Sequence, residues 1–220
     1  MALILNIDTA VEAASVCLAK DGKVLSIAKN ERQGDHAAWL HVGIKEIFEK
    51  NNLEVGSIDA VAVTEGPGSY TGLRIGMATA KGICYALNKP LITLNTLLVM
   101  ANAAKNEDAG LLCPMIDARR MEVFTAIYTK DLQIIAGPTA MTLDEKSFDE
   151  ELKNNRIGFF GNGSSKFQKI KDRSNAIFND IKFDAEAMAS LSDEKFNKKD
   201  FADLAYAEPL YLKEFYTPSK

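Results

Sequence analysis

The chain has 220 residues, of which 47% are hydrophobic and 25% are charged. This composition is typical of a folded globular protein and excludes an intrinsically disordered chain. The length suits one large domain or two small lobes, and it excludes a long multidomain assembly. The formal net charge of −4 gives no overall positive field that would attract nucleic acid or an anionic membrane, so we expect any contact with RNA to need a partner.

Neither the cysteines nor the N-terminal residues indicate export. The three cysteines have no C-x-x-C spacing, so they fit neither a disulfide framework nor a zinc site and are expected to be reduced and buried. The run Met1–Leu5 has no basic segment before it, and no later apolar run reaches the roughly 18 residues that a membrane span needs. We therefore expect a cytoplasmic protein without a membrane anchor.

In chain order, the first predicted elements form an antiparallel meander. Apolar runs at 3–8, 14–19 and 24–28 are separated by short turns, and Asp21-Gly22 is typical of a hairpin. Hydrophobic spacing then predicts helices and strands in alternation, at 37–51, 57–64, 72–87, 90–94 and 97–104. Together these elements predict an α/β fold.

The second half of the chain begins with an echo of the first. Ile7-Asp8 and the returning run 16–18 reappear as Ile116-Asp117 and the run 123–128. The echo predicts two related lobes, residues 1–105 and residues 106–220. In the second lobe we expect a charged surface helix at 143–156, a strand at 157–161, a short helix at 166–172 and a solvated stretch at 192–200.

Two glycine-rich turns follow predicted strands, where phosphate loops often occur. The first, Gly66–Gly76, lacks the Gly-Lys-Ser/Thr ending of a Walker A loop, and Thr71 stands where a dinucleotide fingerprint needs its third glycine. We interpret it as a tight strand-to-helix turn. The second, Gly161–Lys166, fits either a nucleotide cradle or an ordinary turn with a serine cap, and both alternatives stay open.

The helix predicted at 72–87 has too few polar residues for a surface helix, so it must be covered on two sides. Small residues repeat at every fourth position in two rows, Gly72, Gly76, Ala80, Cys84 and Ala78, Gly82, Ala86. One face would pack on the sheet. The other would contact either another helix of the lobe or a second polypeptide, and the sequence leaves both alternatives open.

The helix predicted at 37–51 also carries more apolar surface than one sheet face covers. Its Trp39 is either an interface anchor or a core residue. Replacing Gly76 or Ala80 by a bulky charged residue is expected to abolish association and to leave the monomer folded. The candidate partner-binding residues on the two helices are Trp39, Leu40, Gly43, Ile47, Tyr70, Leu73, Gly76, Met77, Ala80, Ile83 and Cys84.

No catalytic residue, metal ligand or cofactor site is predicted. His36 and His41 are five residues apart, which turns the two rings to different sides of a helix and excludes a shared metal site. Asp8 and Asp117 end related strands and are expected to face each other across an interlobe cleft, where carboxylates could hold hydrated Mg²⁺. The loop after Asp8 has no glycine and contains Glu12, which disfavours ATP. Strand-end caps are the simpler interpretation of both carboxylates.

Four segments together resemble the TsaB (YeaZ) family: Ile7–Ala10, Thr64–Gly76, Ile116–Phe124 and Pro209–Leu212. The resemblance covers almost the whole chain and is densest over the first hundred residues. The glycine motif with its Leu-Arg-Ile-Gly continuation is fairly specific to TsaB and to its catalytic relative TsaD. The family implies a duplicated actin and sugar-kinase-like (ASKHA, ribonuclease H-like) fold with two lobes, in agreement with the echo.

The resemblance also implies a function in tRNA processing, the synthesis of N6-threonylcarbamoyladenosine at position 37 of tRNA. TsaD-like chains carry His-x-x-x-His in the first helix, whereas Leu40 follows His36 here, so a non-catalytic scaffold subunit is implied. It would bind TsaD, and a second copy of itself, through the helices at 37–51 and 72–87. The ATPase TsaE would join this complex, and tRNA would be contacted only through it. The alternative is an ATP-dependent small-molecule kinase that uses Asp8 and Asp117.

Overall fold

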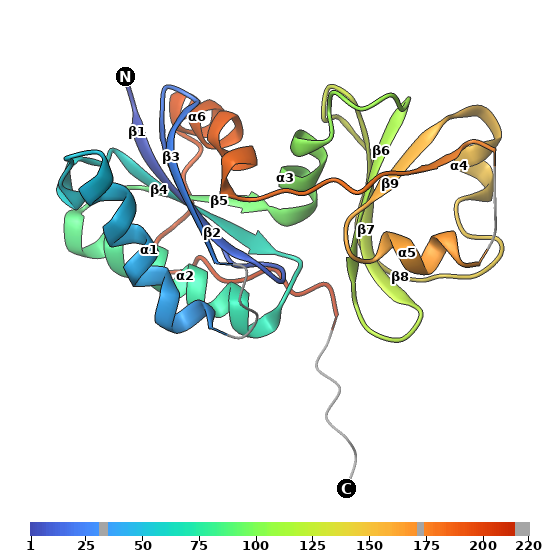
Figure 1. Ribbon diagram of the computed structural model, residues 1–220, viewed down its shortest axis with the longest axis horizontal. Helices are drawn as coiled ribbons and strands as arrows, with labels where there is room; N and C mark the ends of the chain where they lie inside the picture. Colours follow the sequence, from blue (N-terminus) through green and yellow to red (C-terminus); the bar gives the residue numbers. More distant parts are fainter. Residues whose placement is uncertain (31–34, 171–173, 214–220) are drawn as a thin grey trace, which may run out of the picture. The chain divides into compact units, whose positions relative to one another are not determined.

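A computed structural model describes residues 1–30, 35–170 and 174–213, and its elements fall into two compact units. The first unit consists of Met1–Ala103 and Lys182–Pro209, and the second of Ala104–Ile181 and the residues from Leu210 onward (Figure 1). Compared with the predicted lobes, the first boundary lies two residues earlier, and residues 182–209, predicted in the second lobe, belong to the first unit.

The first unit is built on a five-stranded sheet of order β3-β2-β1-β4-β5. The predicted meander is confirmed by β1 (Leu3–Asp8), β2 (Ala14–Lys20) and β3 (Lys23–Asn30), which pair antiparallel. The turn Asp21-Gly22 has positive φ at both residues, as a two-residue hairpin with a right-handed twist requires. The strands β4 (Ala60–Gly66) and β5 (Leu91–Asn95) join in parallel.

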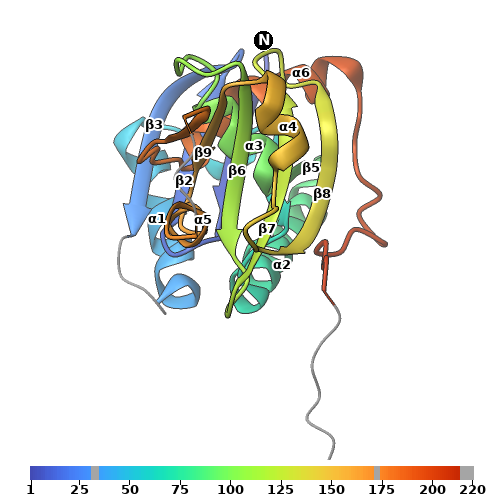
Figure 2. The ribbon, with the colours of Figure 1, turned by 90° about the vertical axis from the view of Figure 1, so that its right-hand side faces the viewer.

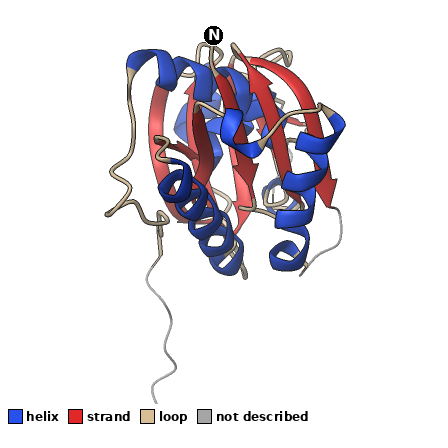
Figure 3. Ribbon diagram, turned by 90° about the vertical axis from the view of Figure 1, so that its left-hand side faces the viewer, coloured by secondary structure: helices blue, strands red, loops and turns tan. Residues whose placement is uncertain are grey.

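Helices cover both faces of this sheet. On one face lie α1 (His36–Lys50) and α2 (Tyr70–Leu87), side by side (Figures 1 and 3). Alternate β1 residues, Leu3, Leu5 and Ile7, form the main core with them. The short helix η1 (Val55–Ser57) precedes β4. The opposite face is covered by α3 (Thr96–Ala103), η2 (Ala185–Met188) and α6 (Ala189–Lys198).

Residues 182–209, which return to the first unit, also pair with the edge of the sheet at β5. Residues 201–209, which we call the strap, follow α6, and the Ala202 N–H donates to the Leu91 carbonyl of β5 at 2.9 Å. The predicted solvated stretch 192–200 is confirmed as largely accessible, since only Ser192 of these residues is buried, but most of it forms the helix α6, which was not predicted. Its few apolar residues gave too weak a periodicity to indicate a packed helix.

The second unit repeats the topology of the first, with a sheet of order β8-β7-β6-β9-β10 (Figure 2). Its hairpin strands β6 (Leu111–Asp117), β7 (Glu122–Thr129) and β8 (Ile134–Thr142) are antiparallel, and β9 (Ile157–Phe160) and β10 (Ala176–Phe178) add in parallel. The predicted echo is thus confirmed strand by strand.

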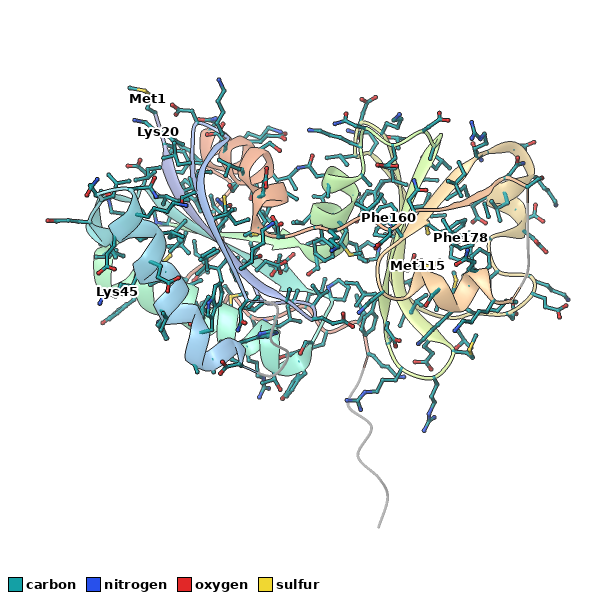
Figure 4. All side chains as sticks on the ribbon, viewed as in Figure 1. Met1, Lys20, Lys45, Met115, Phe160 and Phe178 are labelled. Atoms are coloured by element: carbon teal, nitrogen blue, oxygen red, sulfur yellow. The ribbon has the colours of Figure 1, made fainter. Side chains whose placement is uncertain are left out.

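An aromatic cluster forms the core of the second unit. Phe148, Phe159, Phe167 and Phe178 pack with ring centroids 4.9 to 6.0 Å apart, a spacing that favours edge and offset contacts. Figure 4 shows Phe178 and Met115 within this unit. The cluster joins β9 and β10 to α5 (Ser164–Gln168), the helix that follows β9.

The helix predicted at 143–156 is shorter than expected. Only α4 (Asp149–Asn154) is helical, because Asp144 and Ser147 bond each other's backbone and side chain in a turn, and Phe148 has a φ of 61°. Positive φ at a bulky residue interrupts a helix. Most charged residues of this segment are exposed, as predicted, but the prediction of one continuous helix is wrong.

Candidate functional site

Residues of the turn after β1 and the Ser69 side chain make the hydrogen bonds at the N-terminus of α2. The Ser69 N–H donates to the Ala10 carbonyl at 2.7 Å, and the Ser69 hydroxyl accepts the Gly72 N–H at 3.3 Å. Thr9, in the same turn after β1, donates its hydroxyl to the Gly72 carbonyl at 2.8 Å. Backbone groups that cradle phosphate in other strand-to-helix turns are here used for internal contacts, in agreement with a structural role for this glycine motif.

The first row of small residues on α2 lets this turn approach the helix. A Cβ atom at Gly72 would lie 2.0 Å from the Thr9 carbonyl oxygen, and one at Gly76 would lie 2.3 Å from the Thr9 hydroxyl oxygen. Ala80 and Cys84 continue the row into the main core. The row therefore serves packing within the first unit.

The second row of small residues on α2 faces outward. Ala78, Gly82 and Ala86 are all exposed, and a Cβ atom at Gly82 would meet no atom within 4 Å. Tyr85 stands beside this row with 83% of its surface exposed. The sheet, α1 and the turn after β1 cover the other sides of α2, and the outward row with Tyr85 is its open face.

The α1 helix, which packs beside α2, exposes one large apolar residue. Leu40, Ile44 and Ile47 point into the core, whereas Val42 is 51% exposed. Trp39 lies partly buried over its own helix, where a Cβ atom at Gly43 would be 2.6 Å from its ring. Figure 4 shows Lys45 on the outer side of α1, directed away from the sheet.

The structure changes the picture of the predicted partner-binding residues. Trp39, Tyr70 and Ile83 are partly accessible, but eight of the eleven are buried within the first unit: Leu40, Gly43, Ile47, Leu73, Gly76, Met77, Ala80 and Cys84. They hold the two helices in place, because both helices use their most apolar side for the sheet. The expectation that charged residues at Gly76 or Ala80 leave the monomer folded is corrected accordingly.

The exposed residues that sequence reasoning did not select are Ala78, Gly82, Tyr85, Ala86 and Val42. The repeat of small residues at 78, 82 and 86 was the signal for three of them. It could not be told from the buried repeat at 72, 76, 80 and 84 without knowing which row meets the turn after β1.

Asp8, one of the two predicted Mg²⁺ ligands, is only 1% exposed and is engaged by its own unit. One carboxylate oxygen accepts the Thr64 hydroxyl at 2.8 Å and the Ala10 N–H at 3.0 Å. Burial raises the pKa of this carboxyl, and the charge of Asp184 adds to the increase. A carboxyl that is buried and already accepts two hydrogen bonds within its own unit is a poor ligand for a hydrated cation.

Asp117, the other predicted ligand, lies in the second unit and is partly exposed. Its carboxylate accepts the Lys166 ammonium at 2.7 Å and the Arg119 N–H at 2.6 Å. Partial burial raises the pKa of Asp117, but these hydrogen bonds outweigh the burial and lower it. Both aspartates therefore act as strand-end caps in the structure.

The glycine turn before α5 is closely packed. A Cβ atom at Gly163 would lie 2.9 Å from the Val123 side chain, and Lys166 donates to the Glu122 carbonyl as well as to Asp117. Ser164 donates its hydroxyl to the Gly161 carbonyl instead of capping a helix N–H, so the predicted serine cap is not formed. These contacts support the ordinary-turn interpretation.

Within the described residues, no group of three or more His, Cys, Asp or Glu side chains is placed to hold a metal ion. The His36 ring contacts the Val11 carbonyl at 3.2 Å, whereas His41 is exposed on α1. The cysteines are free and buried. Nowhere in 1–30, 35–170 or 174–213 is a helix both long and apolar enough to cross a bilayer.

Comparisons with known proteins identify the family to which this chain is related. The model of the family TsaD, tRNA N6-adenosine threonylcarbamoyltransferase, matches residues 25–213. The Escherichia coli tRNA threonylcarbamoyladenosine biosynthesis protein TsaB is 29% identical over 96% of this chain and 94% of its own. The TsaB protein of Buchnera aphidicola subsp. Baizongia pistaciae is 31% identical over 76% of this chain and 77% of its own.

A solved structure from Pseudomonas aeruginosa, described as an uncharacterized protein with similarity to peptidase YEAZ, has the same fold. It superposes with a TM-score of 0.86 at 24% identity, covering 97% of this chain and 100% of its own. This superposition and the two sheets of equivalent strand order confirm the duplicated α/β fold with two lobes that the resemblance implied. The chain belongs to the TsaB (YeaZ) family of tRNA threonylcarbamoyladenosine biosynthesis proteins, within the wider family that the TsaD model describes.

Proposed function

We propose that this chain is a non-catalytic partner subunit in tRNA threonylcarbamoyladenosine biosynthesis and binds a TsaD-family transferase subunit through the exposed side of α1 and α2. The observation that carries the proposal is the outward row Ala78, Gly82 and Ala86 with Tyr85 beside it. Membership of the family supports it, because relatives bear the names of both the biosynthesis protein and the transferase.

The outward row has the chemistry of a helix-packing surface. Small side chains let a second helix approach closely, and an aromatic side chain at the margin of the contact fills the space beside it. Between Arg74 and Lys89 the only charged residue is Lys81, so little charge has to lose water when the surface is covered. We name Ala78, Gly82, Tyr85 and Val42 as contact residues, with Trp39, Tyr70 and Ile83 at their margins.

The same surface can pair with a second copy. A two-fold axis brings an identical strip onto itself, since isologous interfaces are self-complementary. We infer that the homodimer and the heterodimer compete for the α1 and α2 surface. The ATPase TsaE would join the heterodimer, tRNA would be bound through the complex because the net charge is −4, and the assembly would work in the cytoplasm.

The contacts of the two aspartates support the non-catalytic assignment. Asp8 is buried and hydrogen bonded to Thr64, while Asp117 is paired with Lys166. A kinase would need carboxylates that are free to bind hydrated Mg²⁺. Calorimetry with Mg-ATP should therefore give no saturable heat with the isolated chain, and tight binding that Asp8→Asn removes would favour the kinase instead.

The test of the binding surface is Ala78→Glu. A glutamate in the outward row adds a charge that must be desolvated on binding, so affinity for the TsaD-family subunit of the same organism should fall at least tenfold, by about 1.4 kcal/mol or more. The matched control is Ala140→Glu, which adds the same side chain at an exposed position of β8 in the second unit.

Both variants should keep the circular dichroism spectrum and the unfolding midpoint of the wild type, since neither alanine is buried. Binding is measured by isothermal titration calorimetry on the purified subunits. Wild-type affinity of Ala78→Glu, or an equal loss with Ala140→Glu, would contradict the proposed surface.

A further inference from the structure

Lys81 fastens the strap to the flank of α2. Its ammonium group donates to the Ala205 carbonyl at 3.2 Å and to the Ala207 carbonyl at 2.8 Å. The strap runs down beside the helix, away from α1, as the loop trace in Figure 3 shows. Hydrogen bonds from a charged donor are among the stronger ones in proteins, so Lys81 restrains the backbone on both sides of Tyr206.

The strap is further fixed by its own turn and by apolar contacts. Asp203 accepts the Ala205 and Tyr206 N–H groups through its side chain, at 2.8 and 3.4 Å, and the Ala207 N–H through its carbonyl at 2.8 Å. Leu204 and Ala207 pack against the main core. The backbone that carries Tyr206 is therefore ordered before any partner arrives.

The Tyr206 side chain itself is left in solvent. It is 82% exposed, and Tyr85, one helical turn beyond Lys81, is 83% exposed. Residues four apart lie on the same side of a helix, so Tyr85 emerges on the side from which Lys81 reaches the strap. An exposed aromatic ring on a restrained backbone loses little conformational freedom on binding, which is the property of an interface anchor.

We propose that the strap forms the outer edge of the partner-binding surface, that Tyr206 contacts the TsaD-family subunit there, and that Lys81 is the residue that positions it. The inference rests on the proposed function and extends its surface from the outward row of α2 across Lys81. Asp203 and Glu208 are exposed on either side of Tyr206. The matching surface of the partner therefore presents basic side chains around an apolar site for the ring.

The test is a double-mutant cycle on the affinity for the TsaD-family subunit. Tyr206→Ala and Lys81→Met should each weaken binding about tenfold, and the double variant should be no weaker than either alone, because both remove the same contact. Lys81→Arg, which keeps a cationic donor, should restore most of the affinity. Leu25→Ala, an exposed apolar residue of β3, and Lys198→Met, on α6, serve as controls.

Hydrogen exchange reports the positioning role directly. In Lys81→Met the amides of Tyr206 and Ala207 should exchange faster than in the wild type, whereas in Tyr206→Ala the Ala207 amide should keep its rate. Wild-type affinity of Tyr206→Ala would overturn the proposal, as would additive losses in the cycle or a loss confined to self-association. If Tyr206→Ala binds normally while Ala78→Glu does not, the strap proposal fails and the proposed function stands.

Discussion

The two rows of small residues on α2 predict opposite effects of the same substitution at Gly76 and at Gly82. Alanine is favoured over glycine in a helix by about 1 kcal/mol. At Gly82 the new methyl group meets no atom within 4 Å, so Gly82→Ala should raise the free energy of unfolding by about 1 kcal/mol. The change adds no charge and does not alter the core.

At Gly76 the new Cβ atom would lie 2.3 Å from the Thr9 hydroxyl oxygen and 3.4 Å from the Val63 side chain. Thr9 must rotate or shift, and its hydrogen bond to the Gly72 carbonyl is lost. Buried groups left unpaired cost about 1 to 3 kcal/mol, and overpacking costs a similar amount. After the gain in helix propensity, Gly76→Ala should lower the free energy of unfolding by about 3 kcal/mol.

Urea unfolding followed by the fluorescence of Trp39, the only tryptophan of the chain, measures both variants in the unit that contains the substitutions. The Thr9→Ala background is the control, because it removes the oxygen that collides. There, Gly76→Ala should cost much less than in the wild type. The reasoning is refuted if Gly76→Ala is as stable as the wild type, or if its cost is unchanged without the Thr9 hydroxyl.

Three further predictions concern buried and paired groups. Burial raises the pKa of Asp8 on folding, so its contribution to stability is complete below pH 3.8 and is lost as the pH rises through the pKa of the folded state. In urea unfolding, Asp8→Asn should therefore be more stable than the wild type at pH 7, and the difference should shrink toward pH 4. Partial burial raises the pKa of Asp117, but hydrogen bonds from Lys166 and the Arg119 N–H outweigh it and lower the pKa, so the stabilisation is present at neutral pH and lost as the pH falls. Because Asp117 is partly exposed, Lys166→Met should cost at most about 1 kcal/mol at pH 7 and flatten the acid side of the stability profile, and an unchanged profile would exclude the pair as a source of stability. Burial raises the pKa of Cys17 and Cys113 to about 12 and that of Cys84 to about 11. All three thiols should therefore react with Ellman's reagent at pH 8 only after urea is added. Fast labelling of the native protein would contradict their burial.

The sequence predicted the elements that have strong local signals. The hairpin of β2 and β3 follows from apolar runs on either side of Asp21-Gly22, and α2 follows from helical spacing after a turn of glycine and proline. The edge strand β8 was missed, because most of its residues are exposed on both faces and its sequence has no alternation of apolar and polar residues.

The candidate surface was predicted at the level of helices and not of side chains. The shortage of polar residues on α2 predicted cover on two sides, of which the structure shows the sheet side, while cover of the outward row stays a prediction. Apolar character cannot distinguish a face that meets the sheet from one that meets solvent. That distinction depends on Thr9, more than sixty residues earlier, and on the strap, more than a hundred residues later. Contacts of this range leave no periodic trace in the sequence.

The path of the chain through the first unit has a consequence for its synthesis. Strand β5 gains its edge partner from Ala202, and the sheet face opposite α1 and α2 is covered by α6. A ribosome must therefore synthesise the chain through α6 before the second face of this sheet can be fully covered, and a nascent chain stopped after residue 105 would leave most of that face open to aggregation. The first unit therefore completes its fold only after most of the second unit has been synthesised.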